Sequence, residues 1–518
     1  MTSSTCSNKE IDSMVLMQIF SPLLTSHRIM NQEFQNSYDG ITCEDGSTVA
    51  FFEEINFLLI AVAQQSVNAV HLVRVCHEIM QHVCGPSFSL LKHSDSHSEM
   101  TTVLIEKFLE LRKSSQPIIT ESLHYENIRE DINSYFLRML QGSTEELKVR
   151  TGIPPSKVHV LILKGTSVIA FYSGKGTSEL KTKEILFLII VASAFTRQSS
   201  SSTHNSLIIL EACVPYTIHL QTFENGITIL LLIEAGLGQI SKSMYSLLKN
   251  VTTYKNTATL KKQIVEVQGL AKKLKHRDTN ISKWGETLVW RDNLRVNQSA
   301  MSALARQIQH GFELICLDPA LLFTAVGHVS AVIELIKMRM PVLGLSSQLP
   351  CRLSPLLHFY PGLVHFVLID RRHHRMISPN LPTEKEPTFC NNMWQMFHTS
   401  LQWLHEGIYQ LMWNDKQFCY SHSIWIGDAT NQKLPWKFCW DIQTGTLGYP
   451  AIMGSEYYEN LMKSGVEDEE AEPVHYFQLF CIHLGLTSPA TVLQQSKEIA
   501  KDLKAFIFPT SSELEDLC

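Results

Sequence analysis

The stretch from Ile229 to Asn250 has the order of elements that holds a dinucleotide in many enzymes. An apolar run ends at Glu234. It is followed by Gly236 and Gly238, and the residues after these glycines have helical spacing. In a dinucleotide-binding fold, such a turn lets the backbone approach a pyrophosphate at the N-terminus of the helix. That chemistry also requires a parallel βαβ unit and a third small residue.

The neighbouring sequence argues against a dinucleotide site. Ser241 stands where the third glycine would be, and no acidic residue ends a partner strand about 20 residues further on. The preceding strands are joined by Asn225-Gly226 and by a short link near Val214-Pro215, which are hairpin connections. Since hairpins predict an antiparallel sheet, we expect a flexible strand-to-helix turn with Ser241 near the helix start. A dinucleotide enzyme remains the alternative, and stabilisation by NAD or FAD that Gly238→Val abolishes would identify it.

Two further motifs combine residue types that could bind ions. His77 and His82 in "HEIMQH" are five apart, about 140° round a helix, whereas a zinc pair needs a spacing of four. We therefore interpret them as positions of an amphipathic helix. The basic run "RRHHR", residues 371–375, could bind phosphates or an anionic membrane. Its place between two predicted strands favours a solvated hairpin tip.

No constellation for covalent catalysis is present in the sequence. It contains no G-x-S-x-G, no Walker A motif and no D-x-D-x-D-G loop. The 12 cysteines are scattered without a C-x-x-C, which is typical of buried thiols in a reducing compartment. The net charge of −6 gives no reason to expect nucleic-acid binding. We expect no enzyme with covalent catalysis, no cofactor and no bound metal.

Size and composition predict a multidomain globular protein. The chain has 518 residues, 44% of them hydrophobic, which is too long for one ordinary domain. The polar start "MTSSTCSNKEIDSM" predicts no secretory signal. The longest apolar runs fall short of the roughly 20 residues that a bilayer span needs. We expect a cytoplasmic protein.

Periodicity in the first third of the chain predicts helices around three short strands. Residues 11–30 have helical spacing with a break or kink near Pro22. Strand-like runs follow around "SYDGITCED", "STVAFFEE" and "NFLLIAVAQ". A helix with Ser66 as its N-cap comes next, and two amphipathic helices are expected over 98–113 and 122–141.

The rest of the chain repeats an architecture without repeating its residues. Residues 158–280 predict a strand hairpin, a buried helix, three strands and then helices, and short helices are expected at 299–315 and 329–339. In the third segment we expect a hairpin in "GLVHFVLIDRRHHRMISPNL" and a long helix over 391–413. Strands are expected in "FCYSHSIWIGD" and "LPWKFCWDIQ". A helix is expected from Ser455, and helical structure again from "EPVHYFQLFCIHL" to Phe506.

This repeat predicts an α+β protein of three modules, each with an antiparallel sheet flanked by helices. The first segment has the same order from its helix onward but lacks the opening strand hairpin. We expect a first module with its helices over 1–145, a second over 155–280, a helical linker region over 281–355 and a third module over 356–518.

Stretches from three parts of the chain, in the same order, resemble the Hermansky–Pudlak syndrome type 1 family. "YPGLVHFVLIDRRHHRMISPNL", "FCYSHSIWIGDATNQKLPWKF" and "GSEYYENLM" are similar to its C-terminal part. "VHVLILKGTSVIAFYSG" with "EILFLIIVAS" resembles the middle part, and "YDGITCEDGSTVAFFEEINFLLIAVAQQ" resembles the first. The resemblance runs from about residue 11 to the end and is weakest across 280–350.

The resemblance implies three longin modules and a role in membrane traffic. Family members pair with the Hermansky–Pudlak syndrome type 4 protein in the third biogenesis-of-lysosome-related-organelles complex. That heterodimer is a guanine nucleotide exchange factor, which promotes GDP release from Rab GTPases serving melanosomes, platelet dense granules and related organelles. By the same resemblance we expect peripheral recruitment to lysosome-related organelle or endosomal membranes.

The missing hairpin keeps a second function open. In the family the paired first modules face the GTPase, so a first module without its hairpin favours a longin scaffold or tether that lacks exchange activity. As a GTPase or partner surface we single out the central hairpin of the first module, although strand positions there are more often core. Its residues are Val49, Phe51, Phe52, Glu53 and Phe57.

Overall fold

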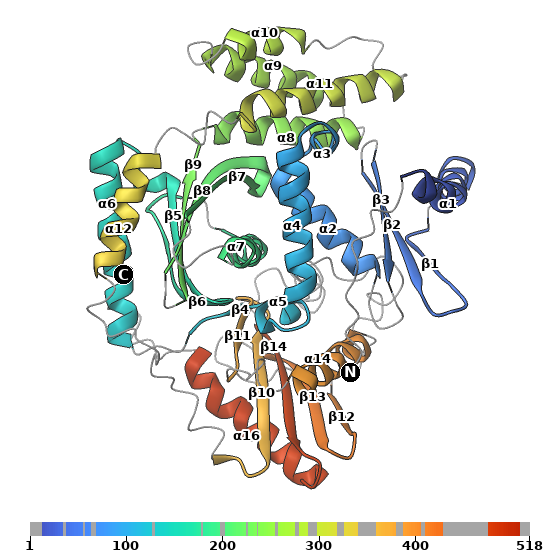
Figure 1. The fold of residues 1–518 in the computed structure, drawn as a ribbon, viewed down its shortest axis with the longest axis vertical. Helices are drawn as coiled ribbons and strands as arrows, with labels where there is room; N and C mark the ends of the chain where they lie inside the picture. The colour runs from blue at the N-terminus through green and yellow to red at the C-terminus, as the bar shows by residue number, and fades with distance from the viewer. Residues whose placement is uncertain are drawn as a thin grey trace. The chain divides into compact units, whose positions relative to one another are not determined.

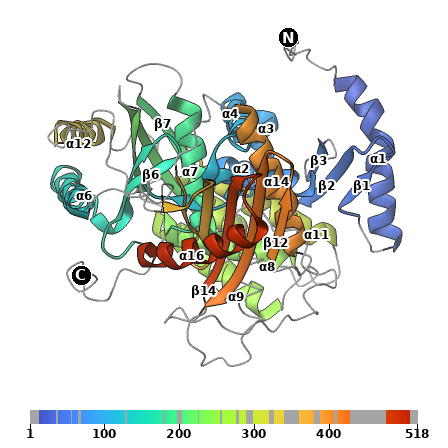
Figure 2. The same ribbon diagram turned by 90° about the horizontal axis from the view of Figure 1, so that it is seen from below.

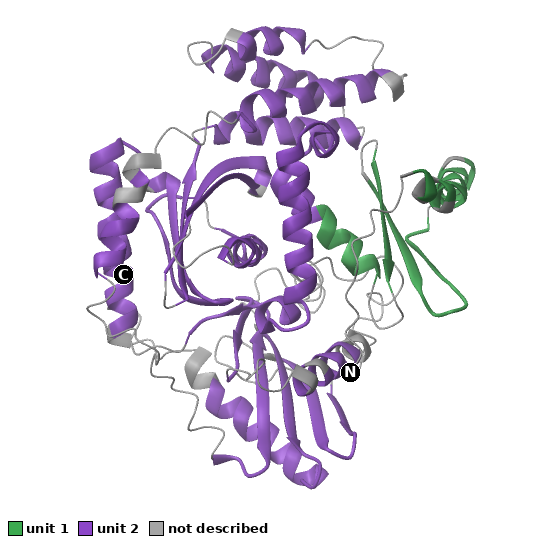
Figure 3. Cartoon of the chain, viewed as in Figure 1, with its two compact units in different colours: residues 1–77 green, residues 78–518 purple. Residues whose placement is uncertain are grey.

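The computed structural model describes most of the chain, and Figure 1 draws its fold. The described residues are 13–34, 38–54, 57–63, 69–126, 130–177, 180–196, 203–223, 226–235, 237–253, 257–274, 279–288, 298–318, 326–339, 359–379, 387–405, 410–427 and 475–507. The chain divides into two compact units, residues 1–77 and residues 78–518, which Figure 3 colours separately.

The first unit is built around a three-stranded antiparallel meander. Its elements are α1 (Ser13–Phe34), β1 (Gly40–Thr42), β2 (Thr48–Glu54), β3 (Phe57–Ala63) and the first turns of α2 (Ala69–Cys84). The strands pair in the order β1-β2-β3. The β1–β2 turn is closed by Asp45, whose Oδ1 accepts hydrogen bonds from the backbone N and the Oγ of Ser47, at 2.9 and 2.6 Å. Gly46 between them has a φ of 80°, which suits glycine.

The meander buries both of its faces, because alternate side chains of a strand point to opposite sides. Ala50 and Ala63 pack against Ala69 and Val73 of α2. Phe51, on the other face, packs against His27 of α1. The first unit therefore has a helix–sheet–helix layering.

The second sheet is five-stranded and antiparallel throughout. Its strands are β5 (Val158–Lys164), β6 (Ser167–Ser173), β7 (Thr203–Leu210), β8 (Val214–Thr222) and β9 (Ile227–Glu234). They pair in the order β6-β5-β9-β8-β7, so the first and last strands in sequence lie side by side at its centre. Residues Val158–Leu163 of β5 and all of β8 are buried, as expected where helices cover both faces.

Helices from three parts of the sequence cover this sheet. One face carries α6 (Glu130–Thr151) and α12 (Val326–Arg339), which share a hydrophobic cluster with β5, β6 and β9. The other side carries α7 (Thr182–Phe195), and Figure 2 shows α7 across the sheet from α6 and α12. Residues Glu184–Ala192 of α7 are all buried, and α7 also packs against α4 (Asp95–Leu111).

The third sheet repeats the arrangement of the second. Its strands are β10 (Leu363–Asp370), β11 (Arg375–Ile377), β12 (Gln410–Asn414), β13 (Phe418–Gly427) and β14 (His475–Leu484), with β4 (Leu123–His124) added at one edge. The order is β12-β13-β14-β10-β11-β4, and β4 pairs with β11 in parallel. Helix α14 (Pro387–His405) packs on the face of Val367, whereas α16 (Pro489–Ile507) packs on the face of Phe366 and Leu368.

Four helices after β9 pack on one another. They are α8 (Gly238–Thr252), α9 (Thr257–Lys273), α10 (Thr279–Thr287) and α11 (Gln298–Cys316). α8 contacts α9 and α11, and α10 contacts the same two helices. We call α9, α10 and α11 the helical arm. The remaining elements are α3 (Leu90–His93), α5 (Gln116–Thr120) and the short 3-10 turns Pro155–Lys157 and Glu211–Cys213.

The structure confirms the α+β class with antiparallel sheets and corrects three sequence predictions. Residues 475–484 form β14 at the centre of the third sheet instead of a helix. The predicted helix over 391–413 ends at His405, and 410–414 form β12. The predicted helix over 122–141 is β4 followed by α6. The strand over 434–443, the helix from Ser455 and the N-cap Ser66 lie outside the described residues.

Module boundaries also differ from those predicted. Helix α6 crosses residue 145, the expected end of the first module, and packs on the second sheet. Helix α12 comes from the expected linker region 281–355 and packs on the same face. The strands of the second sheet form as predicted, but α6 and α12, which cover one face of it, come from outside residues 155–280. None of the described helices combines the length and the apolar character that a membrane span requires.

Candidate functional site

Two of the five residues singled out in the first module are buried beneath α1. Phe51 is 3% exposed and Val49 is 7% exposed. The Phe51 ring stacks on His27 at 5.3 Å and meets Tyr38 edge-on at 5.3 Å. These contacts make Phe51 part of the core of the first unit.

The other three residues lie at different places in the meander. Phe52 points to the opposite face, where its ring lies 4.4 Å from that of His77. Glu53 is exposed, and its Oε2 accepts a hydrogen bond of 2.7 Å from Nδ2 of Asn31. Phe57 is half-buried at the start of β3. The five side chains thus do not form one exposed patch, and Glu53 is the exposed member of the set.

The glycine turn after β9 connects a strand of an antiparallel sheet to helix α8. β9 pairs with β8 and β5, both antiparallel, so the parallel crossover of a dinucleotide site is absent from this described sheet. A Cβ at Gly238 would lie 2.8 Å from a carboxylate oxygen of Glu234, which explains a small residue there. Ser241 Oγ donates to the Leu237 carbonyl at 2.8 Å in the first turn of α8. The predicted place of Ser241 near the helix start is confirmed, and these contacts give no support to a pyrophosphate site.

The two histidines of "HEIMQH" have separate surroundings. His82 Nδ1 donates to the carbonyl of Ile209 at 2.7 Å, and its ring stacks on Phe187 at 4.3 Å. Burial lowers the pKa of His82 to about 4, so the ring is neutral. His77 packs against Phe52 instead. The described residues contain no group of three or more His, Cys, Asp or Glu side chains placed to hold a metal.

The basic run 371–375 is not a solvated hairpin tip as a whole, because Arg371 is 1% exposed. Its Nε and Nη2 donate to Oε1 of Gln478 at 2.9 and 2.7 Å, and its Nη1 donates to the Thr120 carbonyl at 2.7 Å. Only His373 of the run is exposed, with Nδ1 2.6 Å from Oδ2 of the buried Asp370. Arg371 therefore acts inside the protein, as a link between the third sheet and α5.

Residues 116–126 tie the second sheet to the third. The backbone N of Leu123 donates to the His374 carbonyl at 2.7 Å, in the third sheet. The backbone N of Glu126 donates to the Val168 carbonyl at 2.8 Å, in the second. The Gln116 side chain makes two more hydrogen bonds. Its Nε2 donates to the Pro379 carbonyl at 3.2 Å, and its Oε1 accepts from the Ser378 hydroxyl. We call residues 116–126 the connecting strand segment.

Nothing in the sequence pattern singles out this segment. Its apolar residues Ile118, Ile119 and Leu123 fit helical spacing, and its partners in the third sheet lie about 250 residues away. The useful signal is the pair Gln116 and Thr120 beside Pro117 and apolar residues, which suits a buried polar turn. His124 and His365, at the same junction, have their pKa values lowered by burial to about 4 and about 3.

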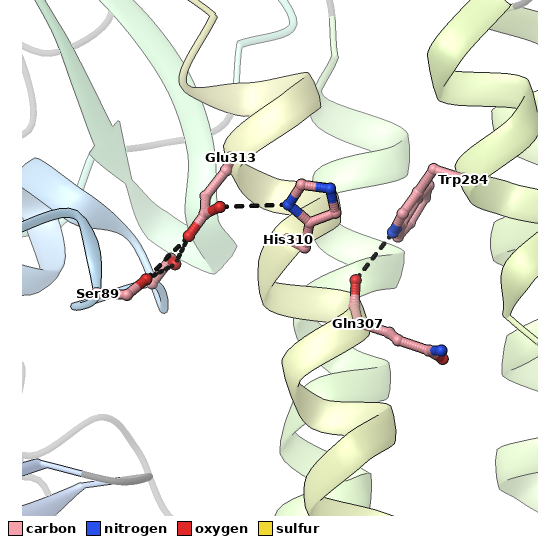
Figure 4. Close-up of polar contacts among 6 residues, drawn as sticks. Ser89, Trp284, Gln307, His310 and Glu313 are labelled. Carbon is pink, nitrogen blue, oxygen red and sulfur yellow. Dashed lines mark hydrogen bonds and ion pairs between the residues drawn. The ribbon is translucent and has the colours of Figure 1, made fainter. Parts of the chain in front are cut away.

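A Ser–Glu–His cluster joins the helical arm to the turn after α2 (Figure 4). Glu313 Oε1 accepts hydrogen bonds from Ser87 and, at 3.0 Å, from Ser89, and its Oε2 lies 3.4 Å from Nδ1 of His310. In a hydrolytic triad the histidine stands between the serine and the acid. Here the carboxylate stands between them, and the printed contact of His310 is with Glu313 and not with either serine. The cluster joins α11 to the turn after α2 and does not have the order of a hydrolytic triad.

Trp284 makes the second contact visible in Figure 4. Its Nε1 donates to the Gln307 carbonyl at 2.8 Å, and its ring lies over Gly311. Gln309 Nε2 also donates to the Pro86 carbonyl at 2.9 Å. Specific contacts over residues 307–313 of α11 thus hold the arm.

Comparison with known families identifies the class of module. Residues 5–111 match the family model of the first longin domain of FUZ, MON1 and HPS1. Residues 362–505 match the model of the third longin domain of the same proteins. Together the two matches cover just under half of the 518 residues. The protein is therefore a longin-domain protein.

The order of the two matches defines the protein more closely. A first longin domain at the start and a third at the end leave room between them for the five-stranded antiparallel sheet of residues 158–234. The two matches support a tri-longin protein similar to FUZ, MON1 and HPS1. The matched models describe all three proteins together and do not distinguish among them.

Proposed function

We propose that this protein is one subunit of a heterodimeric guanine nucleotide exchange factor for Rab GTPases. The observation that carries the proposal is the ordered pair of longin domains of the FUZ, MON1 and HPS1 family, at residues 5–111 and 362–505. Among the three, the stretches quoted above favour the Hermansky–Pudlak syndrome type 1 branch. The proposed partner is the Hermansky–Pudlak syndrome type 4 protein.

This activity suits a protein built from docking modules. Exchange makes and breaks no covalent bond, and the factor needs only to bind the nucleotide-free GTPase better than the loaded one. Sheet edges, apolar patches and a few charges can provide such binding. The Ser–Glu–His cluster and the histidines of α2, which have structural contacts, are consistent with this kind of function.

The proposed setting is the biogenesis of lysosome-related organelles such as melanosomes and platelet dense granules. The complex would be cytoplasmic and would reach these or endosomal membranes peripherally, through its GTPase or other bound proteins. These assignments rest on the sequence resemblance.

The direct test is the rate of GDP release from a panel of Rab GTPases carrying a fluorescent GDP analogue. We expect the purified pair to accelerate release from at least one Rab, and either subunit alone to leave the rate unchanged. Glu53→Lys should lower the acceleration if the exposed end of β2 faces the GTPase. Glu44→Lys, at an exposed position of the β1–β2 turn, is the matched control. An unchanged off-rate for every Rab would refute exchange.

A scaffold or tether is the second candidate function. It is favoured by the first sheet, in which the described residues form three strands where the other two sheets have five or more. A tether would bind its partner or a GTP-loaded Rab and leave the GDP off-rate unchanged. Pull-down with GDP-loaded and GTP-loaded Rabs, beside the release assay, separates the two functions.

A further inference from the structure

Two neighbouring helices, α8 and α9, carry a large excess of lysine. They contain six lysines and one glutamate, a balance of +5 in a chain whose net charge is −6. All six lysines are exposed, and they are Lys242, Lys249, Lys261, Lys262, Lys272 and Lys273. Solvated helix faces usually interleave both signs, because like charges on neighbouring helical positions repel each other. Such an imbalance favours a surface that meets an anion.

A hydrogen bond between α8 and α9 brings their lysines to one surface. Lys242, Ser246 and Lys249 are spaced i, i+4 and i+7, so they follow one stripe of α8. Ser246 Oγ accepts a hydrogen bond of 2.9 Å from Nε2 of Gln263 in α9. Lys262 is the exposed neighbour of Gln263 in the sequence. The lysines of α8 therefore border those of α9.

The exposed stripe continues along α9. Lys262, Val265, Gly269 and Lys272 are spaced i, i+3, i+7 and i+10, and Lys273 follows beside them. Val265 is 66% exposed, and a Cβ at Gly269 would meet no described atom within 4 Å. The helix rises about 16 Å between the first and the last of these residues. The stripe thus has charge at both ends and an uncovered apolar position between them.

The single carboxylate of the two helices leaves this charge largely unbalanced. Glu266 is exposed, and its Oε1 accepts a hydrogen bond of 2.9 Å from Ser243 Oγ. One carboxylate cannot neutralise six ammonium groups, so the surface stays positive at neutral pH. We call Lys242, Lys249, Lys262, Val265, Lys272 and Lys273 the lysine face.

The chemistry of the lysine face discriminates among anionic partners. α8 and α9 contain no arginine, whose planar guanidinium suits a defined phosphate or carboxylate better than the flexible lysine ammonium does. Their one aromatic residue, Tyr245, is half-buried, so a single-stranded nucleic acid has no row of rings on which to stack. Peptide segments bind in grooves or along sheet edges, whereas the outside of a helix is convex.

We propose that the lysine face binds the surface of an anionic lipid bilayer. Bilayer headgroups offer a plane of diffuse negative charge for the lysines, and the boundary below them accepts the Val265 side chain. The contact adds direct lipid binding to recruitment through bound proteins. It does not depend on exchange activity, because it is measured on this chain without a GTPase.

The experiment is flotation of the full chain with vesicles of phosphatidylcholine, either pure or with about 30 mol% phosphatidylserine. We expect the protein to float with the phosphatidylserine vesicles only. Raising the salt from about 0.1 M to about 1 M should release it, because the Debye length falls from about 10 Å to about 3 Å. Equal binding to both kinds of vesicle, or binding that salt does not weaken, would overturn the proposal.

Two matched pairs of substitutions locate the contact. Lys272→Gln with Lys273→Gln should lower the vesicle partition coefficient about thirtyfold, since each lysine near an anionic surface contributes about a factor of five. Lys497→Gln with Lys501→Gln is the control, because these lysines are also exposed on a helix but have acidic neighbours in the sequence. An unchanged melting temperature verifies the fold of both variants. Equal losses for the two pairs, or no loss for the first, would refute the lysine face.

A third substitution and a competing ligand separate a bilayer from other anions. Val265→Trp should strengthen vesicle binding, since tryptophan favours the membrane interface. Weaker binding of this variant would contradict the proposed orientation of α9. Poly-glutamate and a single-stranded oligonucleotide serve as soluble polyanions. If either binds through Lys272 and Lys273 while the phosphatidylserine vesicles do not, the partner is a soluble polyanion and the proposal falls.

Discussion

At the scale of residues, Arg371 decides how the third sheet meets α5. Its guanidinium gives three hydrogen bonds to Gln478 and Thr120 in a site without solvent exposure. Gln478 in turn lies 2.7 Å from Nε2 of His422, whose Nδ1 lies 2.6 Å from Ser400 Oγ. The network runs from α5 through the sheet to α14, so a change at Arg371 affects three elements.

We predict that Arg371→Met destabilises the protein by about 2–4 kcal/mol, because it leaves buried acceptors without donors. Thermal or urea unfolding of the purified chain measures this. Arg150→Met is the matched control, since Arg150 pairs with Glu146 in a surface i,i+4 contact worth about 0.5 kcal/mol or less. Equal effects of the two variants would contradict the assigned role of Arg371.

Buried histidines predict how stability depends on pH. Burial lowers the pKa to about 4 for His82, His124, His159, His219 and His374, and to about 3 for His365. The unfolded chain has histidines with pKa values near 6.5, so it binds more protons than the native state between pH 6.5 and about 4. Stability therefore falls as the pH is lowered through this window.

The measurement is the urea midpoint at steps between those two pH values. We expect a steady decrease toward the acidic end, and a shallower decrease for His159→Gln, which removes one titrating ring. His159 Nδ1 lies 2.9 Å from Ser173 Oγ, a contact that a glutamine amide can replace. A midpoint that stays constant or rises on acidification would disprove the prediction.

At the scale of elements, the packing of α10 on α11 depends on a glycine. A Cβ at Gly311 would lie 2.0 Å from the Trp284 ring, so the indole occupies the space that a side chain would need. Gly269 in α9 has no atom within 4 Å of its hypothetical Cβ. Of these two glycines of the helical arm, Gly311 thus has no room for a side chain, whereas Gly269 has open space.

We predict opposite effects of alanine at these two positions. Gly311→Ala should destabilise the arm by about 1–3 kcal/mol through the clash with Trp284. Gly269→Ala should stabilise it by about 0.5–1 kcal/mol, since alanine is the better helix former. The melting temperatures of the two variants, compared with that of the parent protein, test this prediction. A stabilising Gly311→Ala would show that α10 does not pack on α11 in this way.

The elements differ in how well the sequence predicts them. Hairpin strands such as β5 and β6 are bounded by a glycine turn, and α7 is too long an apolar run for a strand, so both are predictable. β14 is buried on both faces at the centre of its sheet, and its mostly apolar run HYFQLFCIHL, with Gln478 as an interruption, shows no period of two. The same run also suits a buried helix, which explains the wrong prediction.

At the scale of the whole molecule, the order of elements in the sequence predicts the modules. It does not predict which helices and strands of one segment pack on the sheet of another. The sequence pattern predicts a hairpin, a helix, two or three strands and then helices in residues 158–280 and 358–510. The placement of α6, α12 and the connecting strand segment depends on contacts between residues that are far apart in sequence. The five residues singled out at the first hairpin do not share one face, because alternation buries Val49 and Phe51 on the α1 side.

We propose that this protein, with its partner, binds a Rab GTPase most tightly when the GTPase holds no nucleotide. The affinity of the purified pair for one Rab in its nucleotide-free, GDP-loaded and GTP-loaded forms tests this proposal. We expect the tightest binding to the nucleotide-free form, and release of the Rab when GTP is added. Equal affinity for all three forms, or the tightest binding to the GTP-loaded form, would contradict it and identify a tether.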